Sequence, residues 1–480
     1  GPYGSWPSQA VACELCLQNS GGYHWTGEVT PVVGGSLGCT FYQPSGATAG
    51  NYDYTQDSGC VISPIDYLEP AQNSGPTCSG FVGNPVNALT GYKYQMENDI
   101  VDGSYGLGFQ RYYNWTGNNG AWLHSYSASL IAIDYEIFIS LEFKRPQGNS
   151  LNFIWFKDEL HQKRILFDPD LKERMEVVLD QVNAIAGYKL ILKNGLTEHY
   201  NLDGELLAIR DISGYETTLI RDEVNNTLTV LDIVSGNSLV LLFDSIDQAR
   251  LVKVLSSANG VYDYSYDSFG NLVTVAFLDG TEGVSSTQSI RHYHYEDTRH
   301  TNALTGITDA NGDRFATWAY DADGRAISSE HHGGAEKVTI DYTHIDDETD
   351  PRSVATNALG KQTTYHFTEI FGTRKVTQVE GHPSANCAAA NKNYSYDANG
   401  FLASKTDWKG HTTTYVRNTK GQELSRTEAS GTAEARTITT EWHPTFNLRT
   451  KVTEPDRETV YGYDAKGNLL SQQTNDLTTP

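Results

Sequence analysis

One short phrase constrains the fold of this chain more than any other feature, and its clearest copy is segment 394–400, Tyr-Ser-Tyr-Asp-Ala-Asn-Gly. Tyr394 and Tyr396 are two residues apart, so an extended backbone places both rings on the same face of a strand. Asp397 can accept hydrogen bonds from the backbone just ahead of it, and Gly400 can take the left-handed conformation that closes a tight turn. The phrase therefore predicts a strand, a turn and a returning strand.

The same Asp/Asn-x-x-Gly turn pattern recurs along the chain from residue 201 onward. Its copies begin at Asn201, Asp211, Asp267, Asp309, Asp321, Asn357, Asp397, Asp407, Asn418 and Asp464. Neighbouring turns are often about 10 to 12 residues apart, which leaves strands of about 6 to 8 residues, an ordinary strand length. Repetition of one hairpin unit predicts a repeat architecture, in which each hairpin finishes burying its apolar face against its neighbours.

Four of these turns carry a Tyr-Asp pair, and three of the four have a second Tyr two positions earlier. We take these residues as the structural repeat sites of the chain. They are Tyr264, Tyr266, Asp267 and Gly270; Tyr320, Asp321 and Gly324; Tyr394, Tyr396, Asp397 and Gly400; and Tyr461, Tyr463, Asp464 and Gly467.

Upstream of the turns lie segment 84–95, Asn-Pro-Val-Asn-Ala-Leu-Thr-Gly-Tyr-Lys-Tyr-Gln, and segment 107–114, Leu-Gly-Phe-Gln-Arg-Tyr-Tyr-Asn. With these segments and the Tyr-Asp phrases, the chain resembles the bacterial Rhs or YD-repeat proteins over residues 82–480. The resemblance implies an all-β fold, a repeat array of antiparallel hairpins that forms a curved, spiralling sheet and builds a partial cocoon or shell.

In bacterial members of that family, the shell encloses a toxic polypeptide that follows a self-cleaving Asp-Pro-x-Gly junction. The Asp-Pro pairs of this chain, at Asp168 and Asp350, have no Gly in the required place. The chain therefore resembles the shell region of a polymorphic toxin without its C-terminal toxin. The partner implied is a polypeptide cargo or a second Rhs chain that completes the shell.

Composition supports the all-β prediction and excludes some partners. The chain has 29 Tyr and 16 Phe but only 2 Met, and aromatic residues favour strands. A formal charge of −24 excludes nucleic acid and anionic membrane as main partners, because both require basic surfaces. No stretch reaches eighteen apolar residues, so we expect no membrane span.

Residues 1–81 differ in kind from the repeats and predict an irregular, sheet-poor N-terminal cap or plug. They hold Cys13, Cys16, Cys39, Cys60 and Cys78. Disulfides fit this spacing best, with free buried thiols or a zinc half-site as alternatives. Disulfides would place the protein outside the cell, either secreted or at the cell surface. The chain starts with Gly1-Pro2, typical of a cleaved tag, so we expect its natural beginning to be missing.

One segment of the repeat region reads as helical. Asp168-Pro169 has the form of a helix start, and Leu171, Met175 and Leu179 follow at helical spacing. We therefore expect a short helical insertion over residues 168–184.

No set of acid, base and nucleophile converges in the sequence, so we expect no enzyme and no cofactor. His292 and His294 share a strand face, and segments 309–313 and 346–350 are rich in carboxylates, but none has the ligand number or spacing of a metal site. The predicted function is a non-catalytic shell. The alternative is an extracellular adhesion or carbohydrate-binding module whose Tyr and Trp rings stack on a cell-surface glycan.

The amount of wall limits what this chain can enclose. About 400 residues at a rise of about 3.3 Å and a strand spacing of about 4.8 Å give about 6,000 Å² of sheet. We therefore expect an open cup, a narrow tube or a half-shell.

Overall fold

The structure is a computed structural model of the whole chain, and it describes most of residues 80–478. The gaps are 102–106, 118–119, 136–137, 157–164, 168–172, 213, 246–249, 259, 279–287, 371–372, 384–388, 445 and 466. Before residue 80 it describes only three strands. Among the described residues, no helix has the length and apolarity needed to cross a membrane.

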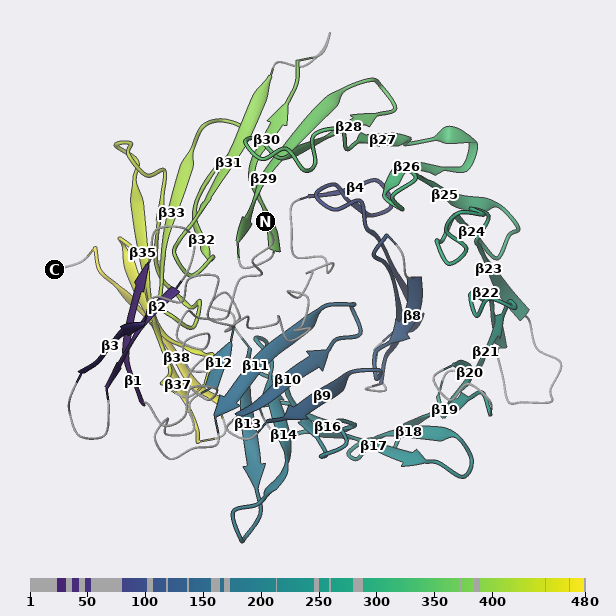
Figure 1. The fold of residues 1–480 in the computed structure, drawn as a ribbon, viewed down its shortest axis with the longest axis horizontal. Coiled ribbons are helices and arrows are strands. Elements are labelled where there is room, and N and C mark those ends of the chain that lie inside the picture. The colour runs from purple at the N-terminus through teal and green to yellow at the C-terminus, as the bar shows by residue number, and fades with distance from the viewer. Residues whose placement is uncertain are drawn as a thin grey trace.

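One antiparallel sheet of 26 strands organises the chain, and its strands lie side by side in sequence order. In Figure 1 this sheet curls around a central space as an open spiral. Its strands are β13 (Arg174–Leu179), β14 (Ile185–Ile191), β15 (Thr197–Tyr200), β16 (Leu206–Arg210), β17 (Glu216–Asp222), β18 (Thr227–Asp232), β19 (Ser238–Phe243), β20 (Leu251–Ser256), β21 (Gly260–Tyr266), β22 (Leu272–Leu278), β23 (Gln288–His294), β24 (Gly306–Thr308), β25 (Arg314–Tyr320), β26 (Ala326–His331), β27 (Val338–Asp341), β28 (Arg352–Asn357), β29 (Gln362–Ile370), β30 (Thr373–Gly381), β31 (Ala390–Tyr396), β32 (Leu402–Thr406), β33 (Thr412–Arg417), β34 (Glu423–Glu428), β35 (Arg436–Trp442), β36 (Arg449–Thr453), β37 (Arg457–Tyr463) and β38 (Leu469–Asp476). The predicted all-β fold of curved antiparallel hairpins is confirmed.

The ten Asp/Asn-x-x-Gly segments share one turn geometry. In each, the first residue accepts a hydrogen bond from the backbone N–H four positions later, at 2.8 to 3.1 Å from its Oδ1. The Gly has a φ between 70° and 88°, a region that disfavours any residue with a Cβ. Local chemistry therefore fixes where each strand ends and the next begins.

Two smaller sheets lie inside the spiral, so residues 82–480 do not form the single continuous sheet that the repeats predict. The first has five strands: β4 (Phe81–Val82), β5 (Val86–Asn87), β6 (Lys93–Ile100), β7 (Phe109–Trp115) and β8 (Gly120–His124). The second has four: β9 (Ser129–Asp134), β10 (Phe138–Lys144), β11 (Ser150–Phe156) and β12 (Ile165–Phe167). We call β4–β8 the inner layer, and the face of the spiral on which it packs the inner face.

The helix predicted over residues 168–184 is wrong where the structure describes that segment. Residues 174–179 form β13, which pairs with β14, and Met175 is buried in the core. The hairpin turn is made by Asp180, whose Oδ1 accepts hydrogen bonds from the N–H groups of Val182 and Ala184, both at 2.8 Å. Asn183 takes a φ of 62° there. Cross-strand pairing and this turn outweigh the helical spacing of a few apolar residues.

The N-terminal segment contains a sheet of three strands, so the expectation of a sheet-poor cap is also wrong. They are β1 (His24–Pro31), β2 (Leu37–Tyr42) and β3 (Thr48–Tyr52), which pair only with one another among the described strands. Cys39 is described only as part of the β2 backbone. Cys13, Cys16, Cys60 and Cys78 lie outside the described residues, so their predicted disulfides stay a prediction.

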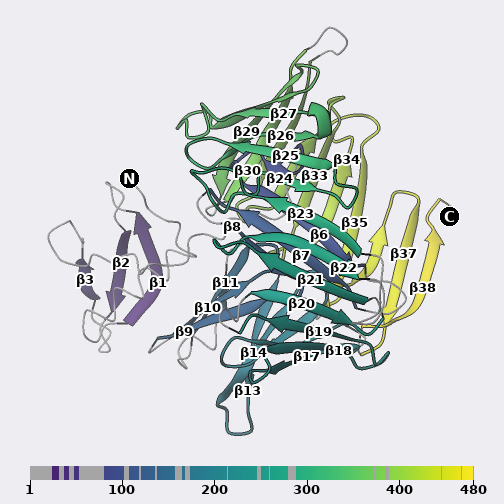
Figure 2. The same cartoon turned by 90° about the vertical axis from the view of Figure 1, so that its right-hand side faces the viewer.

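The spiral does not close on itself through hydrogen-bonded strands. Strands β13 and β38 are its two edges, and each has one described neighbour in the sheet. Figure 2 shows β38 at the outer limit of the molecule. One hydrogen bond between distant parts of the spiral runs from Asn447 Nδ2 to the Lys193 carbonyl, at 2.9 Å.

Candidate functional site

The contact between the inner layer and the spiral is the most elaborate polar region among the described residues. Along β6, alternate residues Lys93, Gln95, Glu97 and Asp99 share one face, since side chains of a strand alternate. Lys93 and Glu97 are buried, and the group meets side chains of β21, β23 and β25. A strand that directs charged residues inward needs matched partners, because an unpaired buried charge is costly.

Arg111 on β7 is the centre of this contact. It forms a two-pronged ion pair with Asp99, with 2.6 Å from Nε to Oδ2 and 2.9 Å from Nη2 to Oδ1, and both side chains are almost fully buried. Nη2 also donates to the Tyr293 hydroxyl at 2.9 Å, and the Tyr264 hydroxyl donates to Asp99 at 2.9 Å. Burial acts to lower the pKa of Arg111, but Asp99, Tyr293 and Tyr264 together outweigh it and the net pKa is raised.

Lys93 lies at the other end of the polar row on β6. Its ammonium lies 4.2 Å from the centre of the Trp318 ring and donates to Gln95 Oε1 at 2.9 Å. Gln95 in turn donates to Glu97 at 2.9 Å, and Glu97 pairs with Arg291 of the spiral. Burial lowers the pKa of Lys93 well below its ordinary value, while the charge of Glu97 acts to raise it.

Backbone carbonyls of the inner layer and its turns complete the contact. Trp318 Nε1 donates to the Asn84 carbonyl at 2.7 Å, and the Ser353 hydroxyl donates to the Ala88 carbonyl at 2.6 Å. Arg374 donates to the Leu89 carbonyl at 2.8 Å. In these three contacts the spiral supplies the donor and the inner layer supplies the carbonyl. Contacts in the opposite direction, such as Arg111 to the Tyr293 hydroxyl, also fix the position of one sheet on the other.

The Tyr-Asp residues serve this architecture in two ways. The Tyr next to the Asp of each phrase donates its hydroxyl to a backbone carbonyl 14 to 20 residues earlier in the chain, at 2.6 to 2.8 Å. These pairs are Tyr266 with Leu251, Tyr320 with Leu304, Tyr396 with Val376, and Tyr463 with Arg449. The earlier Tyr differs from copy to copy: Tyr264 reaches Asp99, Tyr394 packs against the core, and Tyr461 is half-buried.

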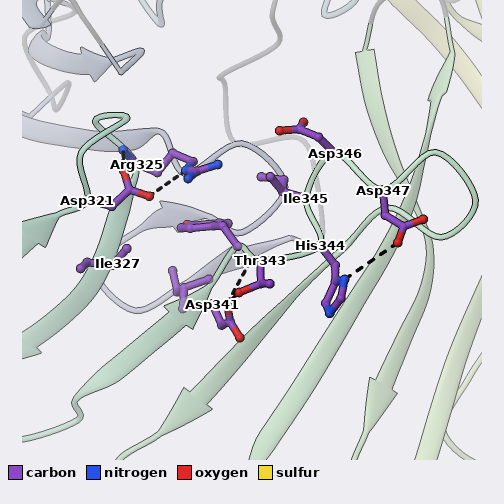
Figure 3. A pocket seen from close by; sticks show the side chains of 11 residues that line it. Asp321, Arg325, Ile327, Asp341, Thr343, His344, Ile345, Asp346 and Asp347 are labelled. Carbon is purple, nitrogen blue, oxygen red and sulfur yellow. Dashed lines mark hydrogen bonds and ion pairs between the residues drawn. The ribbon is translucent and has the colours of Figure 1, made fainter.

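An open hollow of about 550 Å³ lies beside the turns after β25 and β27, and Figure 3 shows its lining. Several of its polar side chains pair with one another. Arg325 Nε lies 2.8 Å from Asp321 Oδ2, and His344 Nδ1 lies 3.9 Å from Asp347 Oδ2. Backbone and hydroxyl hydrogen bonds from Thr349 to Asp347 hold the pKa of that carboxyl at about 2. This chemistry stabilises turns.

The other candidate residues have ordinary partners as well. His292 Nδ1 lies 3.5 Å from the Thr274 hydroxyl, and His294 Nε2 lies 2.8 Å from the Thr308 hydroxyl. Within the described part of the chain, no group of three or more His, Cys, Asp or Glu side chains is arranged to hold a metal ion.

The ion pair of Arg111 and Asp99 was not found from the sequence. The alternation of Lys93, Gln95, Glu97 and Asp99 was a usable signal, since a polar stripe opposite Tyr94 and Ile100 marks a two-faced strand. What the stripe could not reveal is its partner, because Tyr264 and Tyr293 lie more than 150 residues away in the sequence.

Comparison with known proteins gives one family match. A family model described as a domain of unknown function, DUF6531, matches residues 83–153. These residues contain β5 to β10 and part of β11. No curated protein sequence matches the chain.

Solved structures with similarity to this chain include toxin complexes. TcdB2-TccC3 is 12% identical with a TM-score of 0.39, and the match covers 98% of this chain and 28% of that one. TcdB2-TccC3-Cdc42 is 14% identical with a TM-score of 0.36, covering 80% and 22%. A Photorhabdus luminescens Tc holotoxin pore is 11% identical with a TM-score of 0.34, covering 83% and 27%. This chain spans less than a third of the length of these structures.

Proposed function

We propose that this chain is a wall segment of a non-catalytic, secreted or surface-exposed shell of the Rhs or YD-repeat type, and that the shell encloses a polypeptide cargo. One observation carries the proposal: 26 strands follow one another in sequence order in one curved, unclosed sheet. Such a sheet can form the wall of a shell, because each added hairpin extends its surface without requiring a new core.

The inner layer strengthens the proposal. A sheet held against the inner face by the ion pair of Glu97 with Arg291 and by several carbonyl contacts stiffens the wall and fixes its curvature over β21–β30. A wall of this kind can hold a polypeptide by enclosing it and needs no reactive group.

Protease protection tests the proposal. The natural protein that contains these residues, or this chain with its natural partner, is digested before and after the shell is unfolded in urea. We expect the polypeptide outside the shell sequence to resist cleavage while the shell is folded and to be cut once it unfolds. Equal cleavage rates in both states would contradict enclosure, and glycan-array binding without protection would favour the adhesion module.

A further inference from the structure

The inner face of the spiral continues beyond the part that the inner layer covers. Residues opposite each other on paired strands share a face, so the face can be followed from strand to strand. Ser353, which contacts the inner layer, pairs with Tyr365, and Tyr365 pairs with Val379. Val379 pairs with Lys392 on β31. Lys392 therefore lies on the inner face, although the described contacts of β4–β8 end before this strand.

The same face runs on through β32 to β36. Tyr394 pairs with Lys405, and Lys405 pairs with Thr413. Two residues beyond Thr413, Tyr415 pairs with Arg426, and Arg426 pairs with Ile438 on β35. Four residues beyond Ile438 on the same face, Trp442 pairs with Arg449 on β36. An open hollow of about 560 Å³ is lined by Lys405, Thr413, Tyr415 and Arg426, together with His411 and Glu428. We call it the inner hollow.

Three cations on this part of the inner face lie on aromatic rings and have no carboxylate partner among the described residues. Lys392 lies 4.9 Å from the centre of the Trp408 ring, Lys405 lies 5.9 Å from that of Tyr415, and Arg449 lies 5.9 Å from that of Trp442. Glu428 of the inner hollow is already matched, since Arg426 and Arg436 both bind it. Glu434 also lines the hollow, at an exposed turn position. Cations without carboxylates are unexpected in a chain with 59 acidic and 35 basic residues.

The C-terminal part of the wall has no net charge, so it does not repel an acidic ligand as the whole chain would. Residues 390–480 contain eleven basic and eleven acidic residues, so this part of the wall carries none of the chain's formal charge of −24. Where the inner layer covers the same face, its carboxylate Glu97 binds the spiral cation Arg291, and its backbone carbonyls accept from spiral donors. The uncovered part of the inner face also presents cations, but no carboxylate pairs with Lys392, Lys405 or Arg449 among the described residues.

We infer that the inner face over β31–β36, with the inner hollow at its centre, binds an extended, acidic polypeptide segment. Lys392, Lys405 and Arg449 would pair with its carboxylates. The strands from β31 to β36 span about 24 Å at a spacing of about 4.8 Å, which matches about seven residues of extended chain. This inference rests on the proposed function, because it names the part of the cargo that the wall would hold.

Peptide binding tests the inference on the 480-residue protein. The probe is a fluorescein-labelled twelve-residue peptide that alternates Glu and Ser, and the comparison peptide alternates Lys and Ser. We expect the acidic peptide to bind more tightly by fluorescence anisotropy, and to bind more weakly as NaCl is raised, because salt screens exposed charges.

A matched pair of variants locates the site. The double variant Lys392→Glu with Lys405→Glu should weaken binding of the acidic peptide about tenfold or more, a loss of about 1.4 kcal/mol. The control, Lys409→Glu with Lys420→Glu, changes the net charge equally at exposed turn positions and should change binding less than about twofold. Circular dichroism and melting temperature confirm that both variants fold.

Several outcomes would overturn the inference. Equal weakening by both variant pairs would mean a general charge effect, and equal binding of the acidic and basic peptides would mean no specific site. Equal affinity for an oligothymidine of matched length would point to any polyanion and exclude a polypeptide-specific surface. Absence of peptide binding together with protease protection of the cargo would reject this site and leave the shell proposal intact. Peptide binding without protection would retain the site and reject the shell.

Discussion

At the scale of residues, the chain is held in shape by the side chain that opens each turn. Asp and Asn serve equally, because only Oδ1 is required to accept from the backbone ahead. Asn201, Asn357 and Asn418 make the same hydrogen bond to the fourth residue as the seven Asp residues do. The identity of the acceptor atom, and not its charge, therefore sets the turn.

This leads to a prediction at Asp397, whose Oδ1 accepts from the N–H groups of Asn399 at 2.9 Å and Phe401 at 3.0 Å. Asp397→Ala removes the acceptor and should cost about 1 to 2 kcal/mol of folding free energy, since two backbone donors lose their partner. Asp397→Asn keeps Oδ1 and should change stability by less than about 0.5 kcal/mol. Urea unfolding measures both, and an equal loss in the two variants would mean that charge governs the turn.

His124 gives a second prediction at this scale. Burial lowers its pKa to about 4, with a smaller contribution from the charge of Arg221. Its ring stacks on Phe109 with centroids 5.5 Å apart, and Nδ1 accepts from the Tyr126 N–H at 3.3 Å, so the neutral form fits the fold. The unfolded chain, with a His pKa of about 6.5, binds more protons than the folded one between pH 6.5 and 4. The free energy of unfolding should therefore decrease as the pH is lowered from 6.5 to 4.

The measurement is melting temperature against pH for the wild type and for His124→Asn, which keeps an acceptor without a titrating ring. We expect the variant to lose part of the decline between pH 6.5 and 4. His332→Asn, at an exposed position of the short 3-10 turn η1 (His332–Gly334), is the control and should follow the wild-type curve. Identical curves for His124→Asn and the wild type would contradict the role of His124.

At the scale of elements, identical turns differ in what lies against them. Gly312 and Gly324 have φ values of 87° and 78° in turns of the same sequence pattern. A Cβ on Gly312 would meet nothing within 4 Å, whereas a Cβ on Gly324 would lie 1.9 Å from the carbonyl oxygen of Gly117. The turn at Gly324 therefore also contacts the segment between β7 and β8, and Trp115 Nε1 at the end of β7 donates to the Gly324 carbonyl at 2.5 Å.

The two glycines make a matched test of that contact. Gly312→Ala carries only the cost of a left-handed residue, about 1 to 2 kcal/mol. Gly324→Ala adds a clash with the backbone and should be more destabilising by about 2 kcal/mol or more, because overpacking against a backbone atom forces it to move. Thermal unfolding compares the two. Equal melting temperatures would mean that the inner layer is not pressed against this turn.

The same contrast explains what the sequence could predict. The ten turns and the order of the hairpins follow from local chemistry, so segments such as 394–400 predict consecutive hairpins directly. The spiral form of the sheet was implied by the family resemblance. The position of the inner layer cannot be predicted in this way, because Asp99 and Arg111 contact Tyr264 and Tyr293 only once the whole sheet has curved. The wrong prediction of a helix over residues 168–184 has the same origin. The spacing of Met175 from its apolar neighbours fits a helix, and only the pairing of β13 with β14 shows that it lies in a strand.

At the scale of the whole molecule, an open spiral has a length set by its number of hairpins and two edges that a closed barrel lacks. The edge at β38 is apolar at its start, where Leu469 and Leu470 are 54% and 70% exposed. An exposed edge with apolar side chains is a template for another strand, from the next hairpin of a longer wall or from a second molecule.

The 480-residue chain should therefore self-associate through β38 in a concentration-dependent way. Leu470→Lys places a charge on this edge and should lower association, because edge charges oppose strand pairing between molecules. Leu359→Lys is the control, since Leu359 is 92% exposed in the turn after β28, away from the edge. Sedimentation velocity over a range of concentrations measures both variants. Equal reductions would assign the association to general hydrophobicity, whereas a reduction only in Leu470→Lys would identify β38 as the strand from which the wall is extended.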